Sequence, residues 1–242
     1  MYCDAARVAD LAMIRFHRKL KIKDIHTHKL PEVPGEALVC IGCGPLPVRQ
    51  VDFFSAGLHP WDVTGSDEES FRNLEQLLAL PQVLAVGECG FDTLKGPAHD
   101  LQEQAFVRQA ELSERFRKPM ILHVVRDFDS IIRLHKQLRP QQQWLVHGFR
   151  GGPEQMTQLY NNGILVSFGI KCNPETLKQI PSTRLFVETD GAASISDVIR
   201  LAADVRETDF EEIENIVVEN HRRFLLQEPQ QAWEYGSICG GR

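Results

Sequence analysis

The chain has 242 residues, 43% of them hydrophobic, and carries a formal net charge of −6 at pH 7. This length and composition predict one large globular domain rather than a disordered or disulfide-stapled chain. No apolar run reaches the roughly 18 residues that a membrane span needs, so we expect no membrane partner. The acidic balance argues against the broad basic face that holds long duplex DNA, so any nucleic-acid substrate would be bound locally, at one end.

Residues 1–20 mix charged residues with short apolar pieces and predict a helical extension ahead of the domain. They lack the uninterrupted apolar stretch of a signal peptide, and the six cysteines are scattered along the chain. We therefore expect a cytoplasmic location with reduced thiols. Cys40 and Cys43 form a single C-x-x-C, which at the end of an apolar run suits core packing better than a redox or zinc site.

Eight short apolar runs follow, each bounded by turn or helix signals. Near-continuous apolar runs of this length are typical of parallel strands that are buried on both faces. They are residues 22–26, 37–41, 52–57, 83–88, 119–123, 143–147, 163–168 and 185–189.

Helical patterns separate most of these runs. They cover residues 67–80, 100–116, 128–138, 153–161, 174–180, 197–205 and 210–226. The alternation predicts an irregular TIM-type (β/α)8 barrel over residues 21–227. The connections after the first and second runs are rich in Pro and Gly and leave no room for a full helix. Residues 228–242 change in composition and predict a C-terminal tail, partly disordered.

Side chains that bind metals occur where the predicted strands end. In a strand, residues two apart point to the same side, so the H-x-H of the first strand presents two imidazoles together. The residues at these ends are His26, His28, Glu88, His123, His147 and Asp190. Each alone could be a hydrogen-bonded histidine or a helix-capping carboxylate. In a barrel they would share one rim, where unpaired imidazoles and carboxylates are costly unless they bind a ligand.

This set of residues predicts a site for divalent metal ions. Imidazoles and carboxylates suit ions such as Zn, Mn, Ni, Co or Mg rather than Ca. Six ligands exceed the needs of one tetrahedral ion, so we expect two ions with one bridging carboxylate. Two ions about 3.5–4 Å apart can activate a water molecule and stabilise the leaving oxygen of an ester.

A series of motifs spreads over most of residues 22–226. They are DIHTH at 24–28, GLHPW at 57–61, VGECGFD at 86–92, QEQAFVRQAELSERFRKPMILHVVR at 102–126, HGFRGG at 147–152, NGILVSFG at 162–169, LFVETD at 185–190 and VVENHRRFL at 217–225. Together and in this order they resemble the TatD family of metal-dependent hydrolases. The resemblance implies an irregular (β/α)8 barrel with two metal ions.

The resemblance also implies how the six ligands divide: His26, His28 and Asp190 on one ion, His123 and His147 on the other, and Glu88 bridging. Beside the bridging carboxylate, Asp190 would act as the catalytic base for the attacking water. The loop that follows it is shorter than is usual in the family, which leaves the substrate open.

Four further residues are candidates for substrate contact, each with a plainer alternative. His59 resembles the family's phosphate-facing histidine, or it only caps a loop. Arg126 could hold a phosphate oxygen. Asp92 could lie near the substrate, orient a ligand histidine or bond loop amides. Phe149 could stack on a base or sugar, or pack in the core.

We therefore expect a metal-dependent hydrolase, foremost a deoxyribonuclease that hydrolyses phosphodiester bonds at DNA ends from 3′ to 5′. This is the activity that the resemblance implies. The alternative is hydrolysis of an ester or amide, such as a D-aminoacyl ester on tRNA. A third reading, a non-catalytic metal-binding relative, fits less well because every ligand position is filled. We expect a monomer that takes DNA ends or another small ester.

Overall fold

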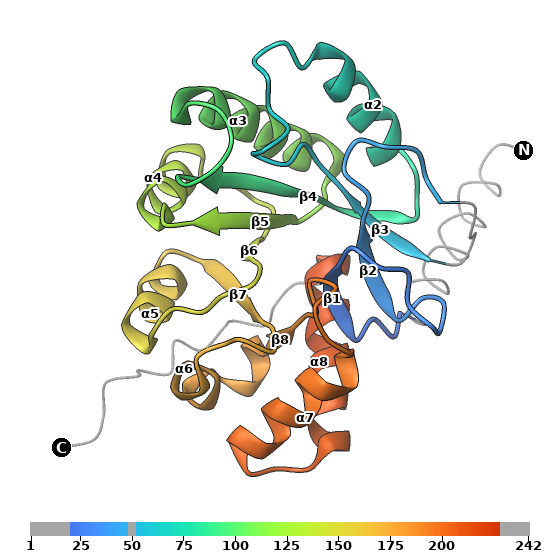
Figure 1. Cartoon of the computed structure of the whole chain (residues 1–242), viewed down its shortest axis with the longest axis vertical. Helices are drawn as coiled ribbons and strands as arrows, with labels where there is room; N and C mark the ends of the chain where they lie inside the picture. Colours follow the sequence, from blue (N-terminus) through green and yellow to red (C-terminus); the bar gives the residue numbers. More distant parts are fainter. Residues whose placement is uncertain (1–19, 48–51, 228–242) are drawn as a thin grey trace, which may run out of the picture.

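The computed structural model describes residues 20–47 and 52–227. Eight parallel strands lie side by side in chain order, with helices around them (Figure 1). The strands are β1 Asp24–Thr27, β2 Ala37–Cys40, β3 Phe53–Ala56, β4 Val83–Asp92, β5 Met120–Val125, β6 Trp144–Val146, β7 Ile164–Phe168 and β8 Phe186–Val187. The predicted irregular TIM barrel is confirmed, because eight consecutive parallel strands alternate with helices.

The helices are α2 Glu68–Leu78, α3 His99–Phe116, α4 Phe128–Leu138, α5 Pro153–Asn161, α6 Pro174–Gln179, α7 Ile195–Arg206 and α8 Phe210–Leu226, with a short 3-10 helix η1 Ser182–Arg184. Their apolar residues recur at helical spacing and face the strands. In α2, for example, Phe71, Leu74 and Leu78 lie three or four residues apart and are all buried. Among the described helices, none has the length and apolar content that crossing a membrane requires.

The barrel is irregular on the side of its first three strands. The described parts of the connections after β1 and β2, residues 28–36, 41–47 and 52, contain no helix. This agrees with the short connections predicted there. The predicted N-terminal helical extension lies outside the described residues except for its last residue, and the predicted C-terminal tail lies wholly outside them.

Strand β4 is longer than the sequence predicted. We expected it to end at Glu88, but it continues to Asp92, because its last four residues pair with β5. The two strands approach so closely that a Cβ at Gly87 or Gly90 would collide with a carbonyl oxygen of β5. Only glycine fits at these two positions. Glu88 therefore lies inside the strand, between two close approaches of the backbone.

Isolated hydrogen bonds, rather than a strand ladder, close the barrel between β1 and β8. In the described residues no strand ladder joins these two strands, whereas each earlier neighbour pair has one. Instead, the amide and hydroxyl of Thr189 donate to the Asp24 carboxylate at 3.0 and 2.6 Å, and the Asp190 amide donates to the His26 carbonyl at 3.1 Å. Burial raises the pKa of Asp24 to about 7. The two loops that carry His28 and Asp190 meet at this seam.

Candidate metal centre

Glu88 lies at the centre of a histidine cluster, and its two oxygens face different imidazoles. Oε1 lies 2.7 Å from Nδ1 of His123 and 2.6 Å from Nε2 of His147. Oε2 lies 3.4 Å from Nε2 of His26 and 3.2 Å from Nε2 of His28. The Glu88 side chain is only 4% exposed. One buried carboxylate divided in this way between two groups of imidazoles has the disposition of a bridging ligand.

Asp190 reaches the same cluster from the loop after β8. Its Oδ1 lies 3.8 Å from Nε2 of His26 and 3.5 Å from Nε2 of His28. Three overlapping triads have ligand atoms within 4.8 Å of one another: His26–His28–Glu88, His26–His147–Asp190 and His59–Glu88–His123. The fold thus gathers all six residues that the sequence predicted as ligands, and it adds His59 to them.

Two buried carboxylates lie behind the histidines that face Oε1 of Glu88. Asp92 Oδ2 is 3.3 Å from Nε2 of His123, and Glu188 Oε1 is 3.4 Å from Nδ1 of His147. The second oxygen of Glu188 accepts a hydrogen bond from the Ser167 hydroxyl at 2.5 Å. A carboxylate on the far nitrogen of a metal-binding imidazole fixes the ring and raises its basicity. The protein therefore orients these two histidines from behind.

Glu188, which is fully buried directly after β8, was not among the residues predicted for the site. We counted it within the eighth apolar run and gave it no role. A signal was present, because Glu is almost never fully buried unless it is paired. A carboxylate inside an apolar run therefore indicates a partner elsewhere in the fold, here His147 and Ser167.

The charges of the cluster shift the pKa values of its members. Burial alone would raise the pKa of Glu88, but the charge of His147 and the imidazole hydrogen bonds outweigh it and hold that pKa far below its usual range. Burial would lower the pKa of His147, yet Glu188 and Glu88 raise it well above its usual value. The two carboxylates on either side of this imidazole thus stabilise positive charge at the centre of the cluster.

His26 provides a test of whether the cluster suits a metal ion. It is completely buried, and neither of its ring nitrogens makes a hydrogen bond within the described residues, although Nε2 lies 3.4 Å from Oε2 of Glu88. Burial, followed by the charge of His147, lowers its pKa, which favours the neutral ring. A buried imidazole without a hydrogen bond is costly, and a neutral imidazole is a common metal ligand. The donor set therefore fits a divalent ion.

The four candidates for substrate contact have different surroundings. His59 lies within the cluster, with Nε2 3.4 Å from Oε1 of Glu88. Arg126 is exposed in the loop that follows β5. Asp92 contacts His123, and this contact favours the alternative in which Asp92 orients a ligand histidine. Phe149 is 2% exposed and packs against other phenylalanine rings, which favours the alternative of core packing over stacking on a base.

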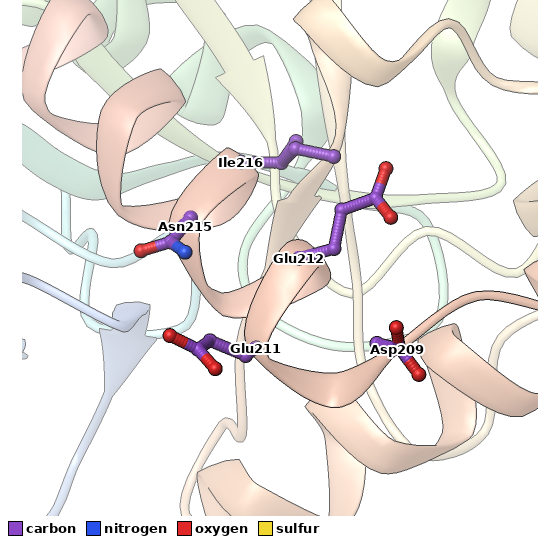
Figure 2. A pocket seen from close by; sticks show the side chains of 5 residues that line it. All are labelled: Asp209, Glu211, Glu212, Asn215 and Ile216. Atoms are coloured by element: carbon purple, nitrogen blue, oxygen red, sulfur yellow. The ribbon is translucent and has the colours of Figure 1, made fainter.

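In the part of the chain that the structure describes, the opposite end of the barrel has an acidic depression and not a histidine cluster. An open depression there is lined by the first turns of α8, at Asp209, Glu211, Glu212, Asn215 and Ile216 (Figure 2). Nearby, Lys23, which precedes β1, pairs with Glu214 of α8 at 3.0 Å, which places this turn at the amino ends of the strands. Figure 2 shows the carboxylates spread around the helix rather than converging on one point. The depression therefore lies apart from the histidine cluster.

Comparison with known proteins supplies the family. The model of the family described as "TatD related DNase" matches residues 49–226. The chain belongs to this family. The resemblance read from the sequence is thereby confirmed, and so is the expected class of enzyme, a metal-dependent hydrolase.

Individual relatives agree with this membership. The chain is 28% identical to "Uncharacterized metal-dependent hydrolase YabD" of Bacillus subtilis, over 74% of this chain and 80% of that protein. It is 34% identical to "3'-5' ssDNA/RNA exonuclease TatD" of Edwardsiella piscicida and 30% identical to the Escherichia coli protein of that name. Each of these two matches spans 56% of this chain and 56% of the exonuclease, so the chain spans about half the length of the exonucleases it matches.

Solved structures share the fold. YjjV, a TatD homolog from Escherichia coli, is 20% identical and superposes with a TM-score of 0.68, over 86% of this chain and all of that chain. A hydrolase of the TatD family from Entamoeba histolytica is 19% identical and gives a TM-score of 0.65, over 78% and 85% of the two chains. At these identities the similarity supports the barrel architecture alone.

Proposed function

We propose that the chain is a two-metal-dependent phosphodiesterase that removes nucleotides from the 3′ end of single-stranded DNA. The observation that carries the proposal is Glu88, whose two oxygens face two separate groups of imidazoles. The names of the TatD exonucleases that the chain matches supply the substrate class and the direction. All six ligands come from one chain, so the proposal needs no second copy.

In this proposal the six residues divide as the resemblance implied. His26, His28 and Asp190 would hold one ion, His123 and His147 would hold the other, and Glu88 would contact both. Bound divalent ions would supply activation of a water molecule and neutralisation of charge on the phosphodiester oxygens. Asp190, whose side chain is 46% exposed, would accept the proton of the attacking water. Asp92 and Glu188 would hold two of the imidazoles in place from behind.

Basic side chains at the mouth support an anionic substrate despite the net charge of −6. In a barrel of parallel strands, the loops after the strands surround the carboxyl end, where the cluster lies. Four consecutive strands, β4 to β7, are each followed by an exposed basic residue: Lys95, Arg126, Arg150 and Lys171. The acidic side chains of the α8 depression lie at the other end. This distribution favours local binding of a phosphate backbone.

His59 and Arg126 are our candidates for direct phosphate contact. His59 lies beside Glu88 and is partly exposed, so one face of its ring borders the mouth. Arg126 is exposed at the start of the loop between β5 and α4, and a guanidinium can bind two phosphate oxygens at once.

The proposal is tested with single-stranded DNA labelled at its 5′ end, with the 3′ end free or blocked, in the presence of Mg, Mn, Zn or Ni. We expect stepwise shortening of the free-ended strand and little of the blocked one. Elemental analysis should find two ions per chain. Glu88→Gln should abolish both the shortening of the strand and the binding of metal, since it removes the charge that two ions would share. Glu111→Gln, at an exposed position on α3, should change neither.

Different failures would have different meanings. Equal degradation by wild type and Glu88→Gln would show that the cluster is not the catalytic site. Equal degradation of blocked and free strands would contradict the 3′ direction. If metal is bound but no DNA is cut, hydrolysis of an ester such as a D-aminoacyl-tRNA becomes the better reading.

A further inference from the structure

Most of the exposed apolar side chains lie in loops that follow strands. Six large hydrophobic side chains are exposed in the described residues, and five of them lie in loops that follow strands. These five are Leu30, Val33, Trp61, Leu94 and Ile170, and the sixth is Leu138 at the end of α4. Isolated exposed apolar residues need no explanation, but a concentration around one site indicates a binding surface.

Trp61 is the largest of these side chains and the one fixed closest to the cluster. It is 43% exposed, yet its Nε1 donates to Oδ2 of Asp92 at 2.7 Å. Its ring centroid lies 4.7 Å from that of His59 and 5.6 Å from that of His123. The indole is therefore held in one orientation beside the candidate ligands, while almost half of its surface remains open.

Asp92 also organises the neighbouring turn. Its second oxygen, Oδ1, accepts hydrogen bonds from the backbone amides of Leu94 and Lys95 at 2.8 and 3.1 Å. The turn places the Lys95 ammonium 3.3 Å from the centroid of the Trp61 ring. One buried carboxylate thus assembles an aromatic face, a cation and an exposed Leu94 side chain into a single surface.

We propose that Trp61 and Lys95 form a subsite for the unpaired base next to the scissile phosphate; this inference rests on the proposed nuclease function. A base offers a flat face that stacks on an exposed indole, and stacking is tolerant of sequence. The entering base displaces the Lys95 ammonium from the ring, and the flexible side chain carries the charge to the adjoining phosphate. A base inside a duplex is stacked on both faces, and a terminal paired base is held against its partner, so the subsite favours single strands.

The plainer alternative is that Trp61 only supports His123 through Asp92. The two roles separate because a support acts on every substrate, whereas a stacking platform acts only on a substrate that carries a base. An oligonucleotide with an abasic residue at its 3′ end retains the phosphates and lacks the terminal ring. It is therefore the matched substrate for the test.

The experiment measures hydrolysis of two single-stranded oligonucleotides that differ only in a terminal base or abasic residue. Trp61→Ala should raise KM for the complete strand roughly tenfold or more, the range of base–aromatic stacking, and leave KM for the abasic strand unchanged. Trp61→Phe, which keeps an aromatic ring, should bring KM for the complete strand most of the way back to the wild-type value. Leu138→Ala, which removes an exposed apolar side chain on α4, should change neither strand.

Binding is measured separately, as fluorescence anisotropy of the labelled strand with metal-free protein in EDTA. Weaker binding of the complete strand by Trp61→Ala supports the subsite, even if the wild type proves unable to cut DNA. If the wild type cuts the complete strand, and Trp61→Ala raises KM equally for both strands or raises it for neither, the subsite is overturned. The nuclease function then remains intact. A wild type that neither binds nor cuts single strands overturns both proposals.

Discussion

The candidate metal centre has two halves that differ in how the fold holds them. The inner half is Oε1 of Glu88 with His123 and His147, at 2.7 and 2.6 Å, and these histidine side chains are 12% and 8% exposed. The outer half is Oε2 of Glu88 with His26, His28 and Asp190, whose separations run from 3.2 to 3.8 Å. In the outer half the side chains of His28 and Asp190 are almost half exposed.

The difference follows from the strands that carry each half. The inner half lies on β4 and β5 and directly after β6, three neighbours that are joined by strand ladders and backed by Asp92 and Glu188. The outer half is assembled across the seam between β1 and β8, where isolated hydrogen bonds replace the ladder. We infer that the inner half is pre-organised, whereas the outer half is open to substrate and depends on the seam.

The largest expected effect concerns Asp190, which we propose as the base in the outer half. Asp190→Asn should lower kcat by about 10²–10⁴, because general base catalysis is lost, while the inner ion stays bound. The measurements are kcat on single-stranded DNA and metal content per chain. Asp204→Asn, an exposed position at the end of α7, is the control. Loss of both ions in Asp190→Asn would contradict the independence of the two halves.

The inner half is tested through Glu188. Glu188→Gln keeps the shape and the contact with Ser167 but removes the charge behind His147. We expect the inner ion to bind about 10–100-fold more weakly and the outer ion to be little affected. Titration of the metal-loaded protein with a chelator resolves the two affinities. If both ions weaken to the same extent, the division into halves is wrong.

The seam should make the metal-free protein sensitive to pH. Burial raises the pKa of Asp24 from 3.8 to about 7, so the folded state takes up a proton that the unfolded state does not. This contribution is fully present below about pH 4 and is lost as the pH rises through about 7, at a cost of roughly 4 kcal/mol.

Asp24→Asn isolates that contribution, because an amide cannot ionise and can still bond to Thr189. We expect the free energy of unfolding, measured with urea in EDTA, to fall less between pH 5 and pH 8 in the variant than in the wild type. Subtracting the free energy of unfolding of the variant from that of the wild type at each pH cancels the contributions of the histidines, which the two proteins share. Identical slopes would show that Asp24 is ionised in the folded protein.

The smallest expected effect concerns Lys29, which lies between the two loops of the outer half. Its ammonium donates to the Gly191 carbonyl at 2.5 Å, and its stem covers Gly191, the residue after Asp190. Because the contact is exposed, Lys29→Met should lower kcat by only about two- to fivefold. Lys29→Arg should recover part of the loss. Lys178→Met, which breaks an exposed pair with Glu207, serves as control. If it lowers kcat as much as Lys29→Met does, Lys29 has no specific role at the site.

The sequence determined the barrel and the ligand set. Alternating apolar runs and helical patterns specify parallel strands with crossover helices, and parallel strands must bring their carboxyl ends to one rim. The positions of His26, His123 and His147 relative to their strands were therefore enough to predict that they meet. The short connections after the first two strands were equally visible, because Pro and Gly exclude helix there.

The tertiary structure decided which side chains stand behind the ligands and which face outward. Register across neighbouring strands, which no local pattern encodes, sets Glu188 against His147 and continues β4 past Glu88. Phe149 turns inward and Trp61 outward, although both follow a site histidine closely in sequence. Loop direction depends on contacts with distant residues, such as the bond of Trp61 to Asp92. The cluster of candidate metal ligands could thus be predicted from the sequence, whereas the candidate substrate surface could be identified only from the fold.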